Sequence, residues 1–250
     1  MDTIILGGDA RMTALAALLD ARRVDEPRTA LALLPTAANV VTNVPPKLDI
    51  AMEAVLDRAA LTATVYTCGP KPGPDDGRVV DLWQDEALLC ENAALTAEGA
   101  VSAAMAVSRR SLRGMECAVI GWGRIGRALT ALLTAIGARV TVLSCTEAHR
   151  REAEASGAAA PDDVTEALSR AGVIFSTPPA MVLDAEHLKY VDSRALILDL
   201  ASPPYGVDLA AAWKLGLRAW REPGLPGRYC PESAAAALAE AIRRGREKRV

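Results

Sequence analysis

The sequence is poor in aromatic residues: its single Phe, four Trp and four Tyr make up 4% of the 250 residues. Too few planar side chains are present for a surface on which nucleic-acid bases stack. An excess of basic charge is also absent, because 28 basic and 31 acidic residues give a net charge of −3 at pH 7. Without a basic field to attract phosphate groups, the chain is not expected to bind nucleic acid or an anionic membrane.

Long apolar runs are missing as well. No stretch has the length of about 18 apolar residues that a membrane span needs, and the first residues lack the pattern of a secretory signal. The five cysteines are odd in number and form no Cys-x-x-Cys pair. Such cysteine usage is typical of a reducing compartment, so we expect a cytoplasmic protein.

Histidine is scarce, and the two present, His149 and His187, are each predicted to lie on a surface helix. A 2-hydroxy-acid dehydrogenase needs a histidine with a carboxylate partner as general acid and base, and neither histidine has that setting. The Gly-x-Ser-x-Gly turn of serine hydrolases is absent. Two isolated histidines without a cysteine cluster also predict no metal site. Catalytic residues therefore stay unassigned.

Apolar runs alternate with helical patterns in the first half of the chain, which predicts a small α/β unit. The segment Thr3–Leu6 is expected to be a strand that turns at Gly7-Gly8-Asp9 into a helix. The other predicted elements are a helix over residues 11–22, strands over 30–34 and 63–66, a helix over 48–59 and a loop over 69–74.

In the second half the alternation is stronger and predicts a parallel sheet covered by helices on both faces. The predicted strands are residues 117–120, 139–143, 173–176, 195–200 and 217–220. Helices are predicted over residues 124–136, 147–156, from 161 onward and over 232–243. We therefore expect an α/β fold with a doubly wound Rossmann sheet.

Two domains are expected. An N-terminal α/β substrate domain over residues 1–95 is completed by the C-terminal helix within residues 228–250. A Rossmann domain covers residues 112–227, and a bridging helix over 96–111 joins the two, with Thr96 as its N-cap. The active site is expected between the domains.

The strongest motif is Gly-x-Gly-x-x-Gly, which follows a predicted strand and opens a predicted helix. Its residues are Gly121, Trp122, Gly123, Arg124, Ile125 and Gly126. In dinucleotide-binding folds the first glycine allows a tight turn, the second lets the backbone approach the pyrophosphate and the third lets helix pack on strand. The motif therefore predicts binding of NAD or NADP.

The end of the second Rossmann strand bears on the choice of cofactor. An Asp or Glu at its tip would bind the ribose 2′-hydroxyl of NAD, but Ser144 and Thr146 stand there, followed by Arg150 and Arg151. These residues suit a 2′-phosphate, so NADP is favoured over NAD. The alternative stays open, because a small shift in register would bring Glu147 to the ribose.

Another loop is expected at the same sheet edge. Thr177, Pro178 and Pro179 follow the fourth strand, where open α/β folds bind their ligands, and are assigned to the nicotinamide side of the cofactor site. The alternative is a strand that two prolines simply terminate. Asp199 ends the next strand and is expected to orient backbone in its turn.

Candidate substrate residues lie nearer the N-terminus. Arg11, after the Gly-Gly-Asp turn, has the side chain to hold a carboxylate through two hydrogen bonds, or is simply an exposed helix arginine. Asn92, Thr96 and Glu98 cluster near the predicted start of the bridging helix, whose positive end would favour an anion. Capping alone also explains Thr96.

Several segments together resemble one protein family found in spore-forming bacteria, the A subunit of dipicolinate synthase, densely from about residue 92 to 245 and sparsely before that. They are Gly7–Arg11, Asn92–Gly99, Val119–Gly126, Ser176–Pro179, Leu196–Ser202, Gly206–Asp208 and Pro223–Gly227. The resemblance implies an NADP-dependent oxidation of a small cyclic dicarboxylate to pyridine-2,6-dicarboxylate during sporulation. It also implies a partner, the flavoprotein-like B subunit of dipicolinate synthase, and it adds Ser202, Leu225, Pro226 and Gly227 to the substrate residues.

Two other functions remain open. The first is an NADP-dependent reductase or dehydrogenase of another small carboxylate on the same scaffold. The second is a non-catalytic, nucleotide-sensing protein whose cofactor controls assembly with a partner. A homo-oligomer is expected in each case.

Overall fold

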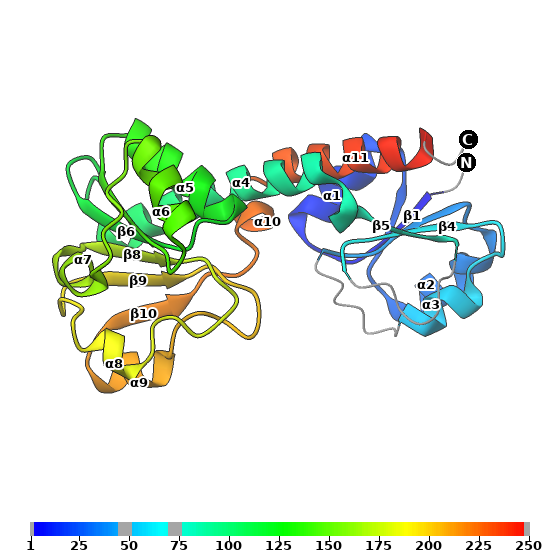
Figure 1. The fold of residues 1–250 in the computed structure, drawn as a ribbon. Helices are drawn as coiled ribbons and strands as arrows, with labels where there is room; N and C mark the ends of the chain where they lie inside the picture. The colour runs from blue at the N-terminus through cyan, green and yellow to red at the C-terminus, as the bar shows by residue number, and fades with distance from the viewer. Residues whose placement is uncertain (1–2, 45–51, 70–76, 248–250) are drawn as a thin grey trace. The chain divides into compact units, whose positions relative to one another are not determined.

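The computed structural model describes residues 3–44, 52–69 and 77–247. The chain divides into two compact units, Met1–Asn92 with Pro226–Val250 and Ala93–Leu225, here called the first and the second unit. Each contains a five-stranded parallel sheet (Figure 1). Within the described residues, no helix is long and apolar enough to cross a membrane. The predicted α/β class with parallel sheets is confirmed.

The sheet of the first unit has the strand order β2-β1-β3-β4-β5, and every pair is parallel. Its strands are β1 (Thr3–Leu6), β2 (Arg22–Val24), β3 (Asn39–Val41), β4 (Thr64–Thr67) and β5 (Val79–Asp81). In this doubly wound order the chain leaves β1 in both directions. The ligand crevice of such a sheet lies where the direction reverses, at the carboxyl ends of β1 and β3.

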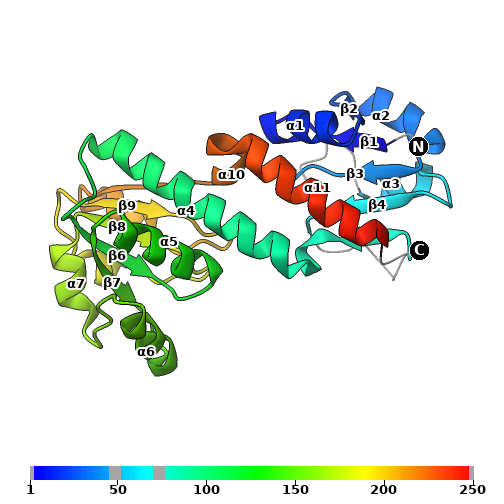
Figure 2. The same cartoon turned by 90° about the horizontal axis from the view of Figure 1, so that it is seen from above.

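Helices cover both faces of this sheet. They are α1 (Ala10–Leu18), α2 (Pro27–Leu33), α3 (Met52–Arg58) and α11 (Pro231–Glu247), with short 3₁₀ helices η1 (Leu34–Thr36) and η2 (Leu82–Gln84). Helices α1 and α11 lie side by side over one face, where Leu15 and Ile242 join Ile5 in one core (Figure 2). On the other face, Leu34 and Val55 pack in a second core.

The sheet of the second unit has the order β10-β9-β8-β6-β7. Its strands are β6 (Glu116–Ile120), β7 (Arg139–Leu143), β8 (Val173–Ser176), β9 (Leu196–Asp199) and β10 (Arg218–Arg221). A parallel bridge between Thr141 and Ala159 adds the trace of a sixth strand beside β7. With that bridge the order is 3-2-1-4-5-6, the order of dinucleotide-binding Rossmann sheets.

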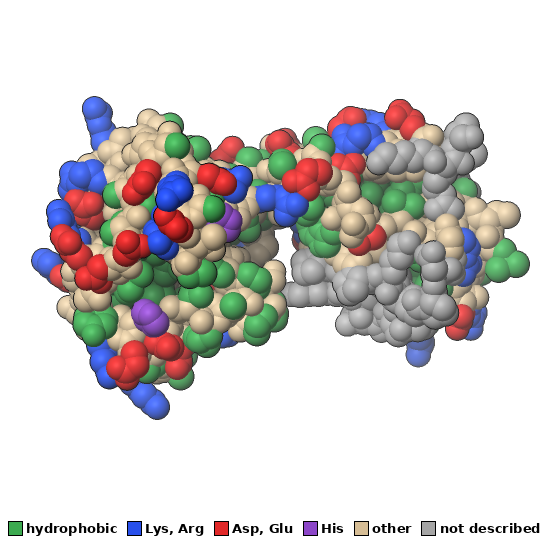
Figure 3. All heavy atoms as spheres, viewed as in Figure 1, with side chains coloured by type: hydrophobic (Ala, Val, Ile, Leu, Met, Phe, Trp, Pro, Cys, Tyr) green, Lys and Arg blue, Asp and Glu red, His purple; other side chains and the backbone are tan. Residues whose placement is uncertain are grey.

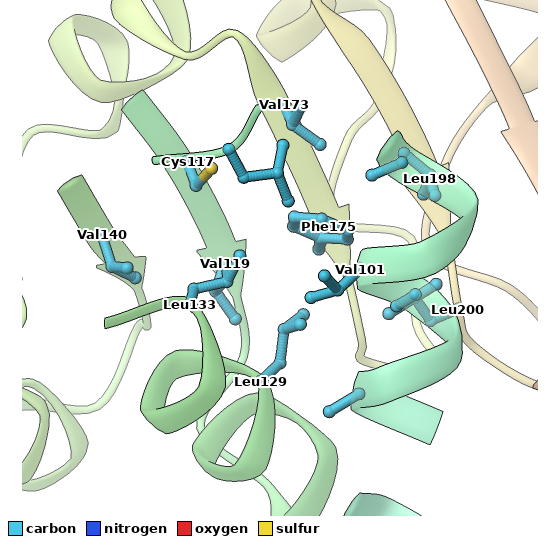
Figure 4. Close-up of a cluster of buried hydrophobic side chains, with 14 of the residues drawn as sticks. Val101, Cys117, Val119, Leu129, Leu133, Val140, Val173, Phe175, Leu198 and Leu200 are labelled. Atoms are coloured by element: carbon cyan, nitrogen blue, oxygen red, sulfur yellow. The ribbon is translucent and has the colours of Figure 1, made fainter. Parts of the chain in front are cut away.

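Strands of the second unit bury side chains on both faces. Val119 and Phe175 join the core under α4 and α5 (Figure 4), whereas Ala118 and Ile174 join the core under α7, α8 and α9. The helices of this unit are α4 (Glu86–Ser108), whose first residues belong to the first unit, α5 (Arg124–Ala135), α6 (Glu147–Ala155), α7 (Val164–Arg170), α8 (Ala185–Leu188) and α9 (Leu209–Lys214). The short helix α10 (Leu225–Tyr229) begins at the boundary, and its residues from Pro226 onward belong to the first unit. Strands buried on both faces are apolar throughout, which explains why their runs were easy to recognise in the sequence.

Two predictions for the first unit are wrong. Residues 30–34 are not a strand but continue α2 into η1, because the Glu26 carboxylate accepts hydrogen bonds from the amides of Arg28 and Thr29 and Pro27 starts the helix. The predicted helix over 11–22 ends at Leu18, and Arg22–Val24 forms the edge strand β2. Parts of the predicted helix 48–59 and loop 69–74 lie outside the described residues.

The helix expected to begin at Thr96 begins ten residues earlier, at Glu86. Asp85 stands at its start, where its carboxylate accepts a hydrogen bond of 2.9 Å from the amide of Leu88. Thr96 therefore lies in the interior of α4 and is not an N-cap. The positive end of this helix is at Asp85, so it does not lie beside Thr96 as predicted.

Candidate functional site

The glycine-rich turn lies at the carboxyl end of β6, between β7 and β8, where the direction of the second sheet reverses. Gly121 has a φ of +94°, a conformation that side chains rarely adopt. A Cβ atom on it would lie 2.6 Å from Thr177 Oγ1, in the loop after β8. The tight turn and the close approach of the two loops both require glycine at this position.

Gly126 meets the same turn from α5. A Cβ atom here would overlap the carbonyl oxygen of Gly121, so the helix packs on the turn only because the side chain is missing. This is the packing role expected of the third glycine of the motif.

Gly123 differs from both. Its φ of −78° and ψ of −169° are open to any residue, and a Cβ atom built on it would meet nothing within 4 Å. It is the N-cap of the 12-residue helix α5, whose first amides have no partner within the helix. No contact within the described structure requires glycine at 123. The N-cap position favours glycine modestly, and a ligand that approaches the backbone is the further physical reason for it.

The other side chains of the motif serve the fold. Trp122 is buried, and its Nε1 donates to Glu152 Oε2 at 2.9 Å. Arg127 pairs with the same carboxylate at 2.7 Å and lies over the Trp122 ring. Ile125 packs against the core, and Arg124 is exposed at the first position of α5. The backbone of the turn is therefore the group best placed to meet a dinucleotide.

At the end of β7, two predicted arginines already have partners. Arg150 donates to the carbonyl of Ser144 at 2.9 Å and pairs with Asp162, which holds the turn after β7. Arg151 is exposed and pairs with Glu147 one helical turn away. Neither pair excludes a phosphate, but only the surface pair of Arg151 exchanges partners at little cost.

The turn after β7 also contains a residue that the sequence did not single out for the ribose. His149 Nδ1 lies 3.5 Å from Ser144 Oγ. Thr146, expected at this site, is exposed and is the N-cap of α6 without a side-chain cap bond. The prediction of a surface position for His149 overlooks its place in the first turn of the helix that follows the second Rossmann strand, where the residue is half-buried.

Loops at the carboxyl ends of β8 and β9 lie beside the glycine turn. Thr177 donates from both its amide and its hydroxyl to the carbonyl of Ile120, which ties the loop to β6. Pro178 would contact a Cβ atom on Gly121, and Pro179 is exposed. The structure thus brings the predicted residues 177 and 178 to the glycine turn.

Asp199 closes β9 and holds the loop that follows. Its buried carboxylate accepts hydrogen bonds of 3.1 to 3.3 Å from the amides of Ala201, Gly206 and Val207. Burial raises the pKa of this carboxyl above its usual value, while the three amides oppose that shift. Ser202 is exposed within this loop, and its carbonyl accepts a hydrogen bond from the amide of Tyr205.

The switch point of the first sheet holds Arg11. Arg11 is only 5% exposed, so the alternative of a simple exposed helix arginine is wrong. Its guanidinium donates to Asp9 Oδ2 at 3.0 Å and to the carbonyl of Val44, while its Nε is buried without a hydrogen-bond partner. A buried guanidinium with a free donor at the ligand crevice of a sheet suits an anion.

Gly227, from the other end of the chain, lies against Arg11. A Cβ atom on it would lie 3.4 Å from Arg11 Cζ, so two predicted substrate residues are brought together within the first unit. Leu225, in contrast, is buried in the core of the second unit against Gly99. Pro226, also predicted as a substrate residue, is buried and has no amide hydrogen, so its backbone offers no donor to a carboxylate.

The remaining predicted substrate residues lie along α4. Asn92 is half-buried, Thr96 is buried and Glu98 is exposed. Asn92 and Thr96 are four residues apart and therefore share a face of the helix, whereas Glu98 does not. The structure does not bring Glu98 together with the other two.

The chain was compared with known families and proteins. Residues 88–201 match the family model of the D-isomer specific 2-hydroxyacid dehydrogenase, NAD binding domain. The A subunit of dipicolinate synthase from Bacillus subtilis (strain 168) is 31% identical over 167 residues, which are 66% of this chain. The aligned chain spans 56% of the length of that relative.

Solved structures share the fold. The A subunit of dipicolinate synthase from Bacillus halodurans superposes with a TM-score of 0.80 at 22% identity, over 97% of this chain and 96% of the other. The A chain of dipicolinate synthase from Bacillus subtilis gives 0.82 at 22% identity, over 99% and 96%. A transhydrogenase from Sinorhizobium meliloti gives 0.69 at 16% identity, over 97% and 91%.

The family-model match supports a nicotinamide dinucleotide as cofactor, and together with the curated relative it supports an NAD(P)-dependent oxidoreductase as the class of protein. The matches confirm the resemblance to the A subunit of dipicolinate synthase that the motifs predict.

Proposed function

We propose that this protein is an NAD(P)-dependent oxidoreductase that oxidises a small cyclic dicarboxylate to pyridine-2,6-dicarboxylate, as the name of its relatives suggests. The observation that carries the nucleotide part is the open space at Gly123, beside two glycines whose missing side chains the protein itself requires. The substrate part rests on the buried Arg11 and on the relationship to the A subunit of dipicolinate synthase.

The described residues fit a dinucleotide. The amides at the amino end of α5 and the bare backbone of Gly123 suit a pyrophosphate, which a helix N-terminus attracts. When bound, the nicotinamide ring supplies the acceptor for a hydride. The loop held by Thr177 and the loop held by Asp199 stand at the same sheet edge and position what binds there.

For the dicarboxylate, Arg11 is the proposed anchor. Its unpartnered Nε and its position against Gly227 leave a guanidinium donor for a carboxylate, and Asp9 fixes the orientation of the side chain. The reaction itself asks little acid–base chemistry of the protein, because formation of an aromatic ring favours loss of the hydride. Positioning of ring and carboxylates is then the main task of the chain.

We propose NADP rather than NAD as the cofactor. No carboxylate stands at the tip of β7, where Ser144 and Thr146 are found, and the nearest one, Glu147, is paired with Arg151. The negative charge of a 2′-phosphate lets it replace Glu147 as the partner of Arg151. His149, beside Ser144, adds a second hydrogen-bond donor.

We further propose that the protein works as a homo-oligomer with a flavoprotein-like B subunit in a reducing compartment of a sporulating cell, the cytoplasm. The name of the relative describes one subunit of an enzyme, which supports a partner chain. All five cysteines are free thiols, which supports the compartment.

The test is a single assay. The purified protein is mixed with NADP or NAD and the freshly formed cyclic condensation product of aspartate semialdehyde and pyruvate, while the absorbance of the reduced nicotinamide and the mass of the product are followed. We expect pyridine-2,6-dicarboxylate with NADP reduced. Turnover of a different carboxylate favours a changed substrate on the same scaffold. Tight NADP binding without turnover, even in the presence of the partner chain, favours a nucleotide sensor.

A further inference from the structure

A cavity lies at the edge of the second unit's sheet that is opposite the glycine turn. Its volume is about 260 Å³, and it opens where β8, β9 and β10 begin. The lining residues are Ser108, Arg110, Met115, Arg170, Ala171, Gly172, Asp192, Arg194, Ala195, Leu196 and Arg218. Dinucleotides bind at the carboxyl edge of such sheets, so this cavity is not part of the site described above.

The lining is strongly basic. Four arginines stand against one aspartate, although the chain as a whole carries a net charge of −3. The arginines come from separate segments, so the fold and not a run of sequence brings them together. Figure 3 shows basic side chains, with acidic ones between them, along the left edge of this unit.

Two of the four arginines have acidic partners. Arg194 binds Asp192 through Nε and Nη2 at 3.0 and 2.9 Å, and this pair is exposed. Arg170 binds Glu166 at 3.1 Å, and its other nitrogen lies 3.8 Å from Glu116. These pairs fix the position of their guanidinium groups at the rim.

Arg110 and Arg218 differ from them. Within the described part of the chain, neither side chain has an ion pair or hydrogen bond, and both are exposed to solvent at the cavity. Two unneutralised guanidinium groups beside two neutralised ones leave a positive charge that no protein group balances. An anion is the ligand that such an arrangement attracts.

We propose that this cavity binds a phosphoryl group, either as free phosphate or as part of an organic phosphate, with Arg110 and Arg218 as its principal ligands. The volume is smaller than that of most small-molecule pockets and suits a single phosphate or pyrophosphate. Guanidinium groups bind phosphate oxygens through paired hydrogen bonds, which gives both the charge and the geometry required.

A neighbouring cavity has space for the organic group of an organic phosphate. It has a volume of about 560 Å³ and shares the lining residues Arg170 and Ala171 with the basic cavity. Small apolar side chains, among them Ala118, Ala160 and Ala167, line it together with charged ones, which are Glu116, Arg139, Glu154, Glu166 and Arg170. An apolar group attached to the phosphate fits over the alanines.

The test measures anion binding by calorimetry at low ionic strength, with NADP at saturation so that the glycine turn is filled. Pyrophosphate is titrated into the unaltered protein, into the double variant Arg110→Gln with Arg218→Gln, and into the control Arg28→Gln with Arg58→Gln, which removes the same charge from the first unit. We expect the dissociation constant to rise about tenfold or more in the cavity variant only, because hydrogen bonds between charged groups are lost. Equal affinity in the two double variants, or no binding to the unaltered protein, overturns the proposal.

Two further ligands separate the sources and the chemistry. Phenyl phosphate should bind more tightly than inorganic phosphate if the ligand is organic, and Ala167→Leu should remove that advantage by filling the neighbouring cavity. Equal binding of the two phosphates supports free phosphate as the ligand. Malonate that binds more tightly than every phosphate overturns the assignment to a phosphoryl group. Unchanged thermal unfolding of the Gln variants confirms that they fold, as expected for exposed side chains.

Discussion

Gly126 packs on the carbonyl of Gly121 so closely that no side chain fits between the helix and the turn. Three residues earlier, Gly123 leaves open space where its side chain would be. One motif thus contains a glycine that the fold requires and a glycine that the fold does not require. The difference separates structural from ligand-binding roles within a single turn.

The first prediction uses this difference. Gly126→Ala should lower the free energy of unfolding by roughly 1–3 kcal/mol or more, because the added methyl group overlaps backbone. Gly123→Ala should cost less stability than Gly126→Ala, since its backbone angles suit alanine and only the preference of the N-cap for glycine is lost, but it should weaken binding of NADP or NAD. Differential scanning calorimetry and fluorescence titration of the nucleotide measure the two effects.

The matched pair has a clear contradicting result. If Gly123→Ala binds the nucleotide as tightly as the unaltered protein, the open space at Gly123 does not face the pyrophosphate. The nucleotide part of the proposed function would then lose the observation that carries it.

The second prediction concerns Arg11. Arg11→Lys keeps the charge but loses the forked geometry, so the KM for the dicarboxylate should rise by about ten- to a hundredfold while NADP affinity stays unchanged. Steady-state kinetics and nucleotide titration measure the two. Because Arg11 also binds the carbonyl of Val44, thermal unfolding is compared first. An unchanged KM in a folded variant would remove Arg11 from the substrate site.

Much of the second unit was predictable because its physical signals are local. Strands β7 and β8 have the predicted bounds. Strand β8 is buried throughout, and β7 buries Val140, Val142 and Leu143 between turn residues that mark its ends. The first unit gave weaker signals. Strands β3 and β5 have three residues each, too few for a periodic pattern, and neither was predicted.

Competing signals account for the other errors. The apolar run at 30–34 is typical of a strand, but Glu26 caps a helix that starts at Pro27, and this helix includes most of the run. The candidate site divides in the same way. The glycine turn could be predicted from spacing, whereas the contact of Gly227 with Arg11 joins residues from opposite ends of the chain and needs the fold.

The third prediction concerns Asp199. Asn at this position would turn one acceptor into a donor that faces the amide of Gly206, so Asp199→Asn should lose roughly 1–3 kcal/mol of stability. Because burial raises the pKa of Asp199, the folded protein binds this proton more readily than the unfolded chain. The stability of the unaltered protein relative to the variant should therefore fall as pH rises from 3.8 through the raised pKa. Urea unfolding of both proteins across this pH range measures the difference, and a difference that grows with pH would contradict it.

The fourth prediction tests the choice of cofactor. Arg151→Gln should weaken NADP binding by about tenfold or more and leave NAD binding unchanged, because only NADP carries the phosphate that replaces Glu147 as partner. Arg150 is less suitable, since it also supports the turn after β7. Lys189→Gln, which breaks a similar exposed pair with Glu186, is the control. Equal losses for both nucleotides would contradict the assignment to NADP.

The fifth prediction uses the thiols as reporters. Cys145 is exposed beside Ser144, at the proposed ribose site. Cys90 is also exposed, but it lies on α4, away from that site in the sequence. Burial raises the pKa of Cys68 and of Cys117 to about 12, so these two should not react with iodoacetamide near neutral pH. Only nucleotide-free protein should expose Cys145, so NADP at about 100 times its Kd should slow alkylation of Cys145 about a hundredfold. Mass spectrometry of the labelled peptides measures each site, with Cys90 as the internal control that NADP leaves unchanged. Equal labelling of Cys145 with and without bound NADP would show that the nucleotide does not cover the end of β7, and the ribose site would have to lie elsewhere.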